Sequence, residues 1–143
     1  VQAGRRIDLP IGRSRAARQR MSTRASRPRA AITEIVRAES LDGLTLTGVM
    51  IFTGRTHQIR VHMAHARYPL IGDPLYSGRA KLPPGAAGPL KEILREFPRQ
   101  ALHARKLSFV HPVSGETLTF QADLPDDLLM LLDYLREDSE TMR

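Results

Sequence analysis

The sequence of 143 residues contains no cysteine, which excludes a disulfide framework, a thiol nucleophile and a thiolate metal site. No uninterrupted apolar run approaches the roughly 20 residues needed to cross a bilayer, and the N-terminus lacks the apolar stretch of a secretion signal. We therefore expect a soluble, cytoplasmic protein made of one domain or part of one. The chain starts at Val1 rather than at a methionine, so we expect a trimmed or truncated start.

Carboxylates are also missing where a metal site would need them. No acidic residue occurs between Asp42 and Asp73, the stretch that holds three of the five histidines. His57 and His62 are five positions apart, and His62 and His65 are three apart. None of these pairs has the His-x-x-x-His spacing of zinc proteases. We expect neither a metal nor another cofactor.

The net charge of +7 is placed at one end of the chain. Residues 1–30 hold nine arginines and one acid, Asp8, whereas the other 113 residues hold 13 basic and 14 acidic groups. Arginine suits phosphate, and such a segment strengthens nucleic-acid binding in a salt-dependent way. Residues 14–29 have few apolar side chains, which predicts a mobile loop or an RNA-contacting arm. The alternative is a disordered basic tail without a specific role. The arginines assigned to the arm are Arg13, Arg15, Arg18 and Arg20.

Residues 53–63 place many ionisable and hydrogen-bonding side chains directly behind a β-type run. The preceding residues 44–52 are rich in β-branched and apolar side chains, which predicts a strand. Gly54 lets the backbone turn, and Thr56 is a good N-cap for a helix that begins at His57. A strand therefore ends where a basic helix starts.

Arg60 lies beside the apolar stripe of this predicted helix. Ile59, Met63 and Ala66 share one face and can pack on a sheet. A half-buried guanidinium next to that stripe is costly to leave unpaired, so it needs a carboxylate or a phosphate. Arg60 is therefore either half of an ordinary structural ion pair or an arginine that orients an anion in a polynucleotide site.

The remaining pattern predicts an α+β fold, with a mixed, largely antiparallel sheet and packed helices. A short edge strand near residues 7–13 precedes a strand at 30–37, and Asp42-Gly43 turns the chain tightly into 44–52.

Later in the chain, Pro89 starts a helix with core residues Leu90, Ile93, Leu94 and Phe97. Residues 101–110 and 116–122 alternate as a half-buried hairpin does. The last helix follows Asp126 and carries Leu128, Leu129, Leu131, Leu132 and Leu135, and residues 137–143 are a polar tail.

Four blocks of the sequence resemble RluA-type RNA pseudouridine synthases. They are Gly54–Met63, Pro69–Tyr76, Arg99–Ala104 and His111–Gly115, in the order of that family. The resemblance runs from about Gly4 to Glu137 and is strongest to members that modify large-subunit ribosomal RNA. It implies the carboxy-terminal half of the catalytic domain, with 23S-type ribosomal RNA as the partner.

The resemblance also implies a chemistry and a role for Arg60. In the family, an aspartate attacks covalently, a tyrosine assists proton removal, and a basic residue of the third block pairs with the aspartate. Arg60 matches that basic residue, and a cation beside a carboxylate keeps the carboxylate ionised. The target uridine must leave its stack, so a pocket with apolar walls is implied. The reaction uses no metal or redox cofactor.

Five further residues are assigned to substrate binding, each with a structural alternative. Leu70 and Ile71 match apolar residues that contact the flipped base, although both could belong to the core. Arg55, His57 and Gln58 either bond to the RNA backbone or fix the turn before the helix.

The family's Arg-Leu-Asp segment and its tyrosine strand are absent from the sequence. We therefore expect the isolated chain to be inactive, to expose apolar sheet surface, and to need the amino-terminal half of the same protein as its partner. A non-catalytic RNA-binding module and a purely structural interaction domain are the competing hypotheses. The aspartates that follow apolar residues without the required neighbours are Asp8, Asp42 and Asp133, and the tyrosines Tyr68, Tyr76 and Tyr134 all come after the third block.

Overall fold

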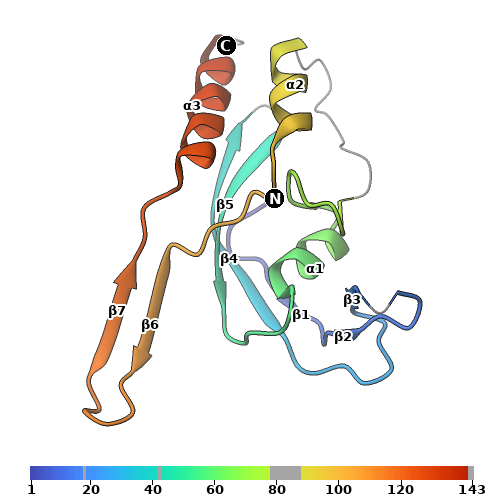
Figure 1. Ribbon diagram of the computed structural model, residues 1–143, viewed down its shortest axis with the longest axis vertical. Coiled ribbons are helices and arrows are strands. Elements are labelled where there is room, and N and C mark those ends of the chain that lie inside the picture. The colour runs from blue at the N-terminus through green and yellow to red at the C-terminus, as the bar shows by residue number, and fades with distance from the viewer. Residues whose placement is uncertain (18, 42, 78–87, 142–143) are drawn as a thin grey trace. The chain divides into compact units, whose positions relative to one another are not determined.

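The computed structural model describes residues 1–17, 19–41, 43–77 and 88–141, with the side chains of 138–141 left out. The chain forms two compact units, residues 1–100 and 101–143 (Figure 1). The elements of the first are β1 (Arg6–Asp8), β2 (Gly12–Arg13), β3 (Met21–Ser22), β4 (Ile32–Leu41), β5 (Leu44–Ile51), α1 (Gln58–His65) and α2 (Gly88–Glu96). Those of the second are β6 (Lys106–Val110), β7 (Thr117–Gln121) and α3 (Asp126–Thr141).

The first unit is built on an antiparallel sheet with the strand order β1-β4-β5. The predicted edge strand is β1, and the predicted strand at 30–37 is β4, which extends farther to Leu41. Leu41 pairs with Leu44, so the tight connection predicted at 42–43 is confirmed from its flanks, although Asp42 itself lies outside the described residues. Gly43 has a φ of 83°, a left-handed conformation that glycine adopts without strain. The α+β prediction is confirmed.

Helix α1 packs on one face of this sheet (Figure 1). Met63 joins Ile7 of β1 and Ile35 of β4 in a buried cluster, against which Ile59 and Ala66 also pack. The apolar stripe predicted on the helix is therefore confirmed as its core-facing side. Burial of these side chains provides the main driving force that holds the helix against the sheet.

A buried histidine ties α1 to two strands. His62 is fully buried, with Nδ1 2.7 Å from the Thr33 hydroxyl and Nε2 2.8 Å from the Leu9 carbonyl oxygen. A carbonyl can only accept, so Nε2 carries a proton. Burial lowers the pKa of the imidazole, so the ring is neutral at pH 7 and its Nδ1 accepts from the Thr33 hydroxyl.

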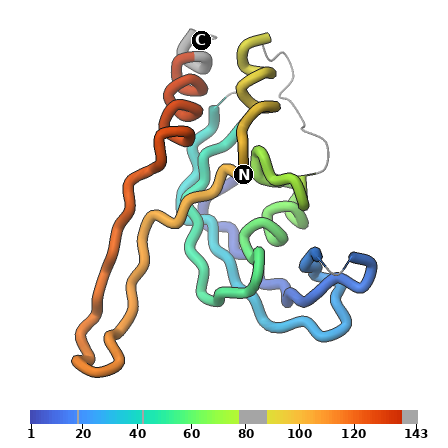
Figure 2. The backbone as a smooth tube through the Cα atoms, in the orientation of Figure 1, coloured from blue at the N-terminus to red at the C-terminus, as the bar shows by residue number. Residues whose placement is uncertain are grey.

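The arginine-rich segment is folded within the first unit rather than forming an open loop. Strands β2 and β3 pair as a short hairpin, and the tube of this segment turns back on itself in Figure 2. An isolated bridge also joins Ile11 to Arg29. Met21 packs on a second buried cluster that contains Ile11, Val61 and Tyr76. The prediction of a mobile loop missed this anchoring. It comes from a single methionine side chain and from backbone pairing, which a count of apolar residues does not detect.

The loop after α1 contains a glycine that no other residue can replace without strain. Gly72 has a φ of 73°, and a Cβ on it would lie 2.1 Å from the carbonyl oxygen of Arg99. The following helix, α2, buries Leu90 and Leu94 as predicted, whereas Ile93 and Phe97 are only partly buried.

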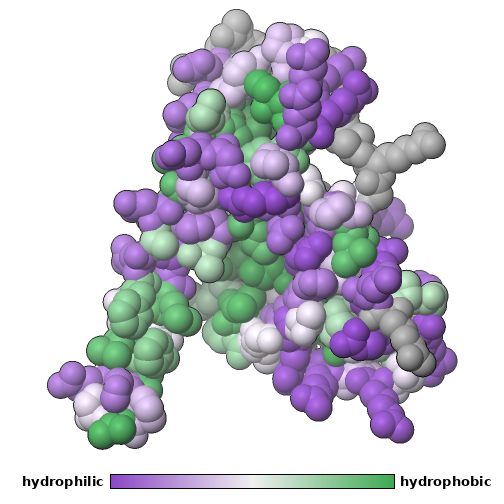
Figure 3. Space-filling model, viewed as in Figure 1, coloured by the Kyte–Doolittle hydropathy of each residue, from purple (hydrophilic) through white to green (hydrophobic). Residues whose placement is uncertain are grey.

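The second unit combines the hairpin β6–β7 with helix α3. The two strands pair from Lys106 with Gln121 to Val110 with Thr117, shorter than predicted. Leu107, Phe109 and Phe120 share one face of the hairpin but are exposed, and apolar side chains gather there in Figure 3. This exposed apolar surface agrees with the expectation for the isolated chain and departs from that of a half-buried hairpin.

Helix α3 buries four of the five predicted leucines; Leu129 is exposed instead. The helix also continues to Thr141, through most of the segment predicted as a polar tail, because polar side chains alone do not end a helix. Among the described helices, none is both long and apolar enough to span a membrane.

Replacing Gly72 with alanine should lower the free energy of unfolding by about 2–4 kcal/mol, because the left-handed backbone and the Arg99 carbonyl both oppose a Cβ. Urea unfolding of the variant measures the loss. Gly54→Ala is the matched control, since a Cβ there meets nothing within 4 Å. Equal losses at the two positions would contradict the assignment.

Acid should destabilise the first unit through His62. The unfolded imidazole takes up a proton near pH 6.5, whereas the folded one does so only at lower pH. The contribution of the neutral imidazole to the free energy of unfolding is therefore fully present above pH 6.5. It falls as the pH drops below that value toward the pKa of the folded state. Urea unfolding between about pH 8 and pH 5 measures this drop. His62→Gln should reduce this drop to the part that His57, whose pKa is also lowered, contributes, while His103→Gln should keep the full drop because His62 remains.

Candidate functional site

The turn between β5 and α1 is organised by the buried side chain of Gln58. Its Oε1 accepts hydrogen bonds from the Thr53 hydroxyl at 2.6 Å and from the Arg55 N–H at 3.1 Å. Its Nε2 donates to the Ile32 carbonyl at 2.9 Å and to the Thr33 hydroxyl at 3.0 Å. Every hydrogen of the amide is used within the chain, so the contacts of Gln58 favour the turn-fixing alternative.

Helix α1 begins one residue later than predicted, and its N-cap is His57 rather than Thr56. His57 has a φ of 57°, and its side chain makes no capping bond. The predicted cap was wrong because the helix begins at Gln58, so that His57, and not Thr56, is the residue directly before its first turn. Gly54, the expected turn residue, does not adopt a left-handed backbone; His57 does. A non-glycine residue in this region costs on the order of 1–3 kcal/mol, and such residues concentrate at functional sites.

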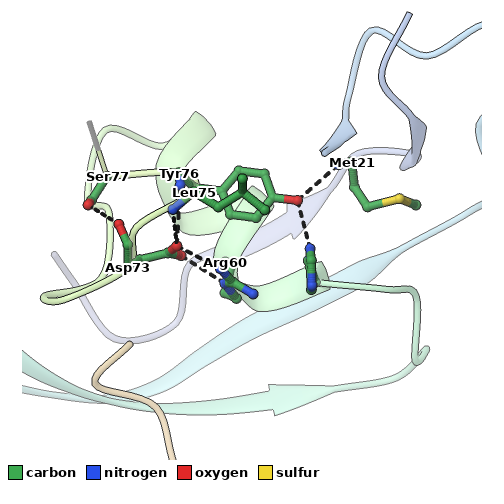
Figure 4. Close-up of polar contacts among 7 residues, drawn as sticks. Met21, Arg60, Asp73, Leu75, Tyr76 and Ser77 are labelled. Atoms are coloured by element: carbon green, nitrogen blue, oxygen red, sulfur yellow. Dashed lines mark hydrogen bonds and ion pairs between the residues drawn. The ribbon is translucent and has the colours of Figure 1, made fainter. Parts of the chain in front are cut away.

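Arg60 and Asp73 form a two-pronged ion pair (Figure 4). Nε donates to Oδ2 at 2.9 Å, and Nη2 donates to Oδ1 at 2.7 Å. The Arg60 side chain is 11% exposed and that of Asp73 is fully buried. Arg60 therefore faces a carboxylate rather than bulk water. For Nη1 there is no hydrogen-bond acceptor among the described residues.

The carboxylate of Asp73 also closes the loop that follows it. Oδ1 accepts the backbone N–H groups of Leu75 at 2.9 Å and Tyr76 at 3.2 Å, and the Ser77 hydroxyl donates to the Asp73 carbonyl (Figure 4). Burial raises the pKa of Asp73, but the bonds from Arg60 and from the two N–H groups outweigh burial and lower it overall. The bond to Asp73 in turn raises the pKa of Arg60. Both groups are therefore charged at neutral pH.

Tyr76 lies at the centre of the site. Its hydroxyl accepts the backbone N–H of Met21 at 2.9 Å and is 2.8 Å from Nδ1 of His57 (Figure 4). The guanidinium groups of Arg60 and Arg20 lie 5.1 Å and 5.2 Å from the centre of its ring. These distances are typical of cation–π contacts.

His57 is a neutral histidine in this setting. Burial and the nearby positive charge of Arg60 lower its pKa, and Asp73 only partly opposes them. Because the Tyr76 hydroxyl already accepts from Met21, its own proton can go to Nδ1 of His57, which leaves Nε2 as a donor. His57 is partly exposed, so that donor is available to a ligand.

The other predicted site residues are placed around this centre with different exposure. Nε of Arg55 donates to the Ala30 carbonyl at 2.8 Å, which again fixes the turn. Leu70 packs against the buried cluster of Ile7, Ile35 and Met63, and Ile71 is partly buried. The exposed arm arginines are Arg13, Arg15 and Arg20, while Arg18 lies outside the described residues.

Sequence reasoning missed Asp73 and Tyr76 as site residues. Their spacing carried a signal, because an aspartate two and three residues before N–H groups commonly closes a turn with its side chain. Within the described part of the chain, no three His, Asp or Glu side chains gather closely enough to hold a metal ion.

Comparison with known proteins gives several long matches. The chain is 48% identical over all its 143 residues to ribosomal large subunit pseudouridine synthase D of Vibrio cholerae. It is 47% identical over 140 residues to the synthase of the same name from Pseudomonas aeruginosa, and 41% identical over 140 residues to that of Escherichia coli. This chain is homologous to the carboxy-terminal part of ribosomal large subunit pseudouridine synthase D. No family model matches the chain.

The chain spans 43–44% of the length of these pseudouridine synthase D relatives, and the matches cover 98–100% of this chain. A solved structure, human RNA pseudouridylate synthase domain containing 4, superposes with a TM-score of 0.64 at 24% identity. That match covers 94% of this chain and 57% of the human one, and it supports the fold.

Asp73→Asn should lower the free energy of unfolding by about 2–4 kcal/mol, because a shielded guanidinium loses its charged partner. Asp123→Asn makes the same change at an exposed aspartate and should cost less than about 0.5 kcal/mol. Urea unfolding at pH 7 compares the two variants. Equal stability of both would show that the ion pair does not hold the loop.

Lowering the pH should act on the same pair. Since the folded pKa of Asp73 lies below its ordinary value of 3.8, its stabilisation is present above pH 3.8 and is lost as the pH falls through the folded pKa.

Proposed function

We propose that this chain supplies the carboxy-terminal part of the active site of an RNA pseudouridine synthase that isomerises uridines in large-subunit ribosomal RNA. The observation that carries the proposal is the guanidinium of Arg60, held in one direction by Asp73 within a chain homologous to pseudouridine synthase D. The relatives bear the name of an enzyme of the ribosomal large subunit. Work on ribosomal RNA would place the protein in the cytoplasm.

In this proposal, Arg60 serves two carboxylates. Asp73 uses Nε and Nη2 and so sets the plane of the guanidinium. Nη1 then remains for the nucleophilic aspartate, which polypeptide outside these 143 residues would supply. A cation at hydrogen-bond distance would keep that aspartate ionised in a pocket closed to water, as attack on the ribose requires.

The isomerisation detaches uracil from the ribose, rotates it, and rejoins it through carbon. Because the base is never released to water, the site must hold it between two bonding geometries. Leu70 and Ile71 are proposed as its apolar wall, and the Nε2 of neutral His57 as a donor to RNA. Leu70 would use the part of its surface that is not packed on the core.

RNA binding is proposed for the exposed arginines of the hairpin β2–β3 and its loop. Arg13, Arg15 and Arg20 are exposed, and the part of the chain before residue 30 carries the excess positive charge. Phosphate contacts of this kind fix register without reading sequence. Arg55 and Gln58 would support the site by holding the turn before α1.

A non-catalytic RNA-binding module is the second candidate function. It is favoured by the same exposed arginines and by the absence of an Arg-Leu-Asp segment from the sequence. The two candidates differ in what Arg60 does: the first needs it for chemistry, and the second only for structure or affinity.

A chimera tests the choice. The segment of the Vibrio cholerae synthase that matches this chain is replaced by the 143 residues, and pseudouridine formation in large-subunit ribosomal RNA is measured. We expect the chimera to be active and the isolated chain to be inactive. Arg60→Ala should lower the chimera's kcat by at least about 100-fold, as loss of a preorganised charge does, with RNA affinity nearly unchanged.

Controls separate chemistry from folding. Arg60→Lys keeps the charge but cannot form the two-pronged pair, so it should recover only part of the activity. Arg95→Ala removes an exposed arginine of α2 and should leave activity unchanged. A uniform loss of RNA affinity in Arg60→Ala, with turnover per bound RNA preserved, would instead support the binding module.

A further inference from the structure

Tyr76 connects two parts of the site that are 55 positions apart in sequence. On the side of the arginine-rich hairpin, its hydroxyl accepts the Met21 N–H, and the Arg20 guanidinium lies 5.2 Å from its ring centre. The Met21 side chain packs on the buried cluster to which Tyr76 belongs. The position of residues 20 and 21 therefore depends directly on one tyrosine.

On the other side, the same tyrosine contacts the proposed catalytic centre. Its N–H donates to Asp73, its hydroxyl bonds to His57, and its ring lies 5.1 Å from the Arg60 guanidinium. With the residue only 9% exposed, Tyr76 has little freedom to move independently of these groups. A displacement of the hairpin would therefore move Tyr76 and, with it, the contacts that Tyr76 makes with His57 and Arg60.

The charges around the ring point to a ligand for Arg20. Arg60 and Arg20 lie at nearly the same distance from one ring, but only Arg60 has a carboxylate partner among the residues that the structure describes. Arg20 is exposed, and no carboxylate of the described residues forms a salt bridge with it. An exposed guanidinium of this kind can bind an anion, and the polyanion of the proposed function is RNA.

We propose that Tyr76 is a positioning residue that holds the β2–β3 hairpin against Arg60 and His57, so that Arg20 presents a phosphate-binding guanidinium beside the uridine site. This inference rests on the proposed function, because it takes RNA as the anion. It assigns Tyr76 no contact with the reacting atoms. Its effect is geometric: phosphate binding at Arg20 and the direction of Arg60 become parts of one rigid arrangement.

Tyr76→Phe in the 143-residue chain tests the hydroxyl bond directly. The ring and its packing stay, but the Met21 N–H loses its acceptor, so hydrogen exchange at the Met21 amide should speed up by about tenfold or more, the equivalent of one lost hydrogen bond. The imidazole of His57 should titrate at a higher pH, because the neutral form loses its donor. Tyr68→Phe is the matched control, since the hydroxyl of exposed Tyr68 has no hydrogen-bond partner among the described residues.

A double-mutant cycle then tests whether Tyr76 positions Arg20. Binding of a fluorescent oligouridylate is measured against salt concentration for Arg20→Gln, with and without Tyr76→Phe. In the native background, Arg20→Gln should weaken binding several-fold and reduce the salt slope by about 0.7, the loss of one phosphate contact on a single strand. In the Tyr76→Phe background, we expect less than half of that effect. Arg15→Gln, an exposed arm arginine for which no Tyr76 contact is seen, should weaken binding equally in both backgrounds.

Two outcomes overturn the proposal. If Tyr76→Phe lowers the unfolding midpoint but leaves Met21 exchange and His57 titration like those of Tyr68→Phe, the tyrosine is merely structural. If Arg20→Gln has the same effect in both backgrounds, Tyr76 does not position Arg20. The exchange and titration measurements need no RNA. They therefore decide the positioning role even if oligouridylate does not bind or the chimera is inactive, results that would count against the proposed function.

Discussion

A single buried carboxylate determines the geometry of the site. Asp73 accepts two hydrogen bonds from Arg60 and two from backbone N–H groups, so its charge is satisfied entirely within the fold. The same four bonds fix the direction of the guanidinium and fold the loop that brings Tyr76 to α1. Loss of any of these bonds would leave the buried charge of Asp73 less well compensated, which is costly in free energy. The arrangement is therefore rigid. This buried ion pair thus also positions the side chains of the site.

The side of α1 that faces the sheet is held by a small number of shared hydrogen bonds. Thr33 accepts from Gln58 and donates to His62, so one hydroxyl of β4 orients two helix side chains. Gln58 in turn ties Thr53 and Arg55 to the start of the helix. These bonds keep the left-handed backbone of His57 in place, because the residues on both sides of it are anchored. The partly exposed side chain of His57 is therefore carried by a turn whose neighbouring residues are fixed by hydrogen bonds.

The homology and the geometry both support the proposed contribution of this chain. It brings a fixed cation, a neutral imidazole and exposed arginines, which are groups suited to binding and orienting anions. The relatives extend well beyond the matched segment, and the proposed nucleophile would come from that additional length. The exposed apolar face of β6–β7, with Leu107, Phe109 and Phe120, is compatible with further polypeptide packing on it.

Sequence alone determined the α+β class, the strand predicted at 44–52 and found at 44–51, the helix after it, the stripe of Ile59, Met63 and Ala66, and the need of Arg60 for an anion. These follow from local periodicity and from the cost of an unpaired buried charge, both of which are readable from neighbouring residues. Only the tertiary structure decided which acid Arg60 contacts and that His57, rather than Gly54 or Thr56, makes the turn. It also decided that residues 20 and 21 dock on Tyr76. Such contacts join residues 13 to 55 positions apart, and their choice depends on how the packed sheet and helix bring side chains together, which no local pattern encodes.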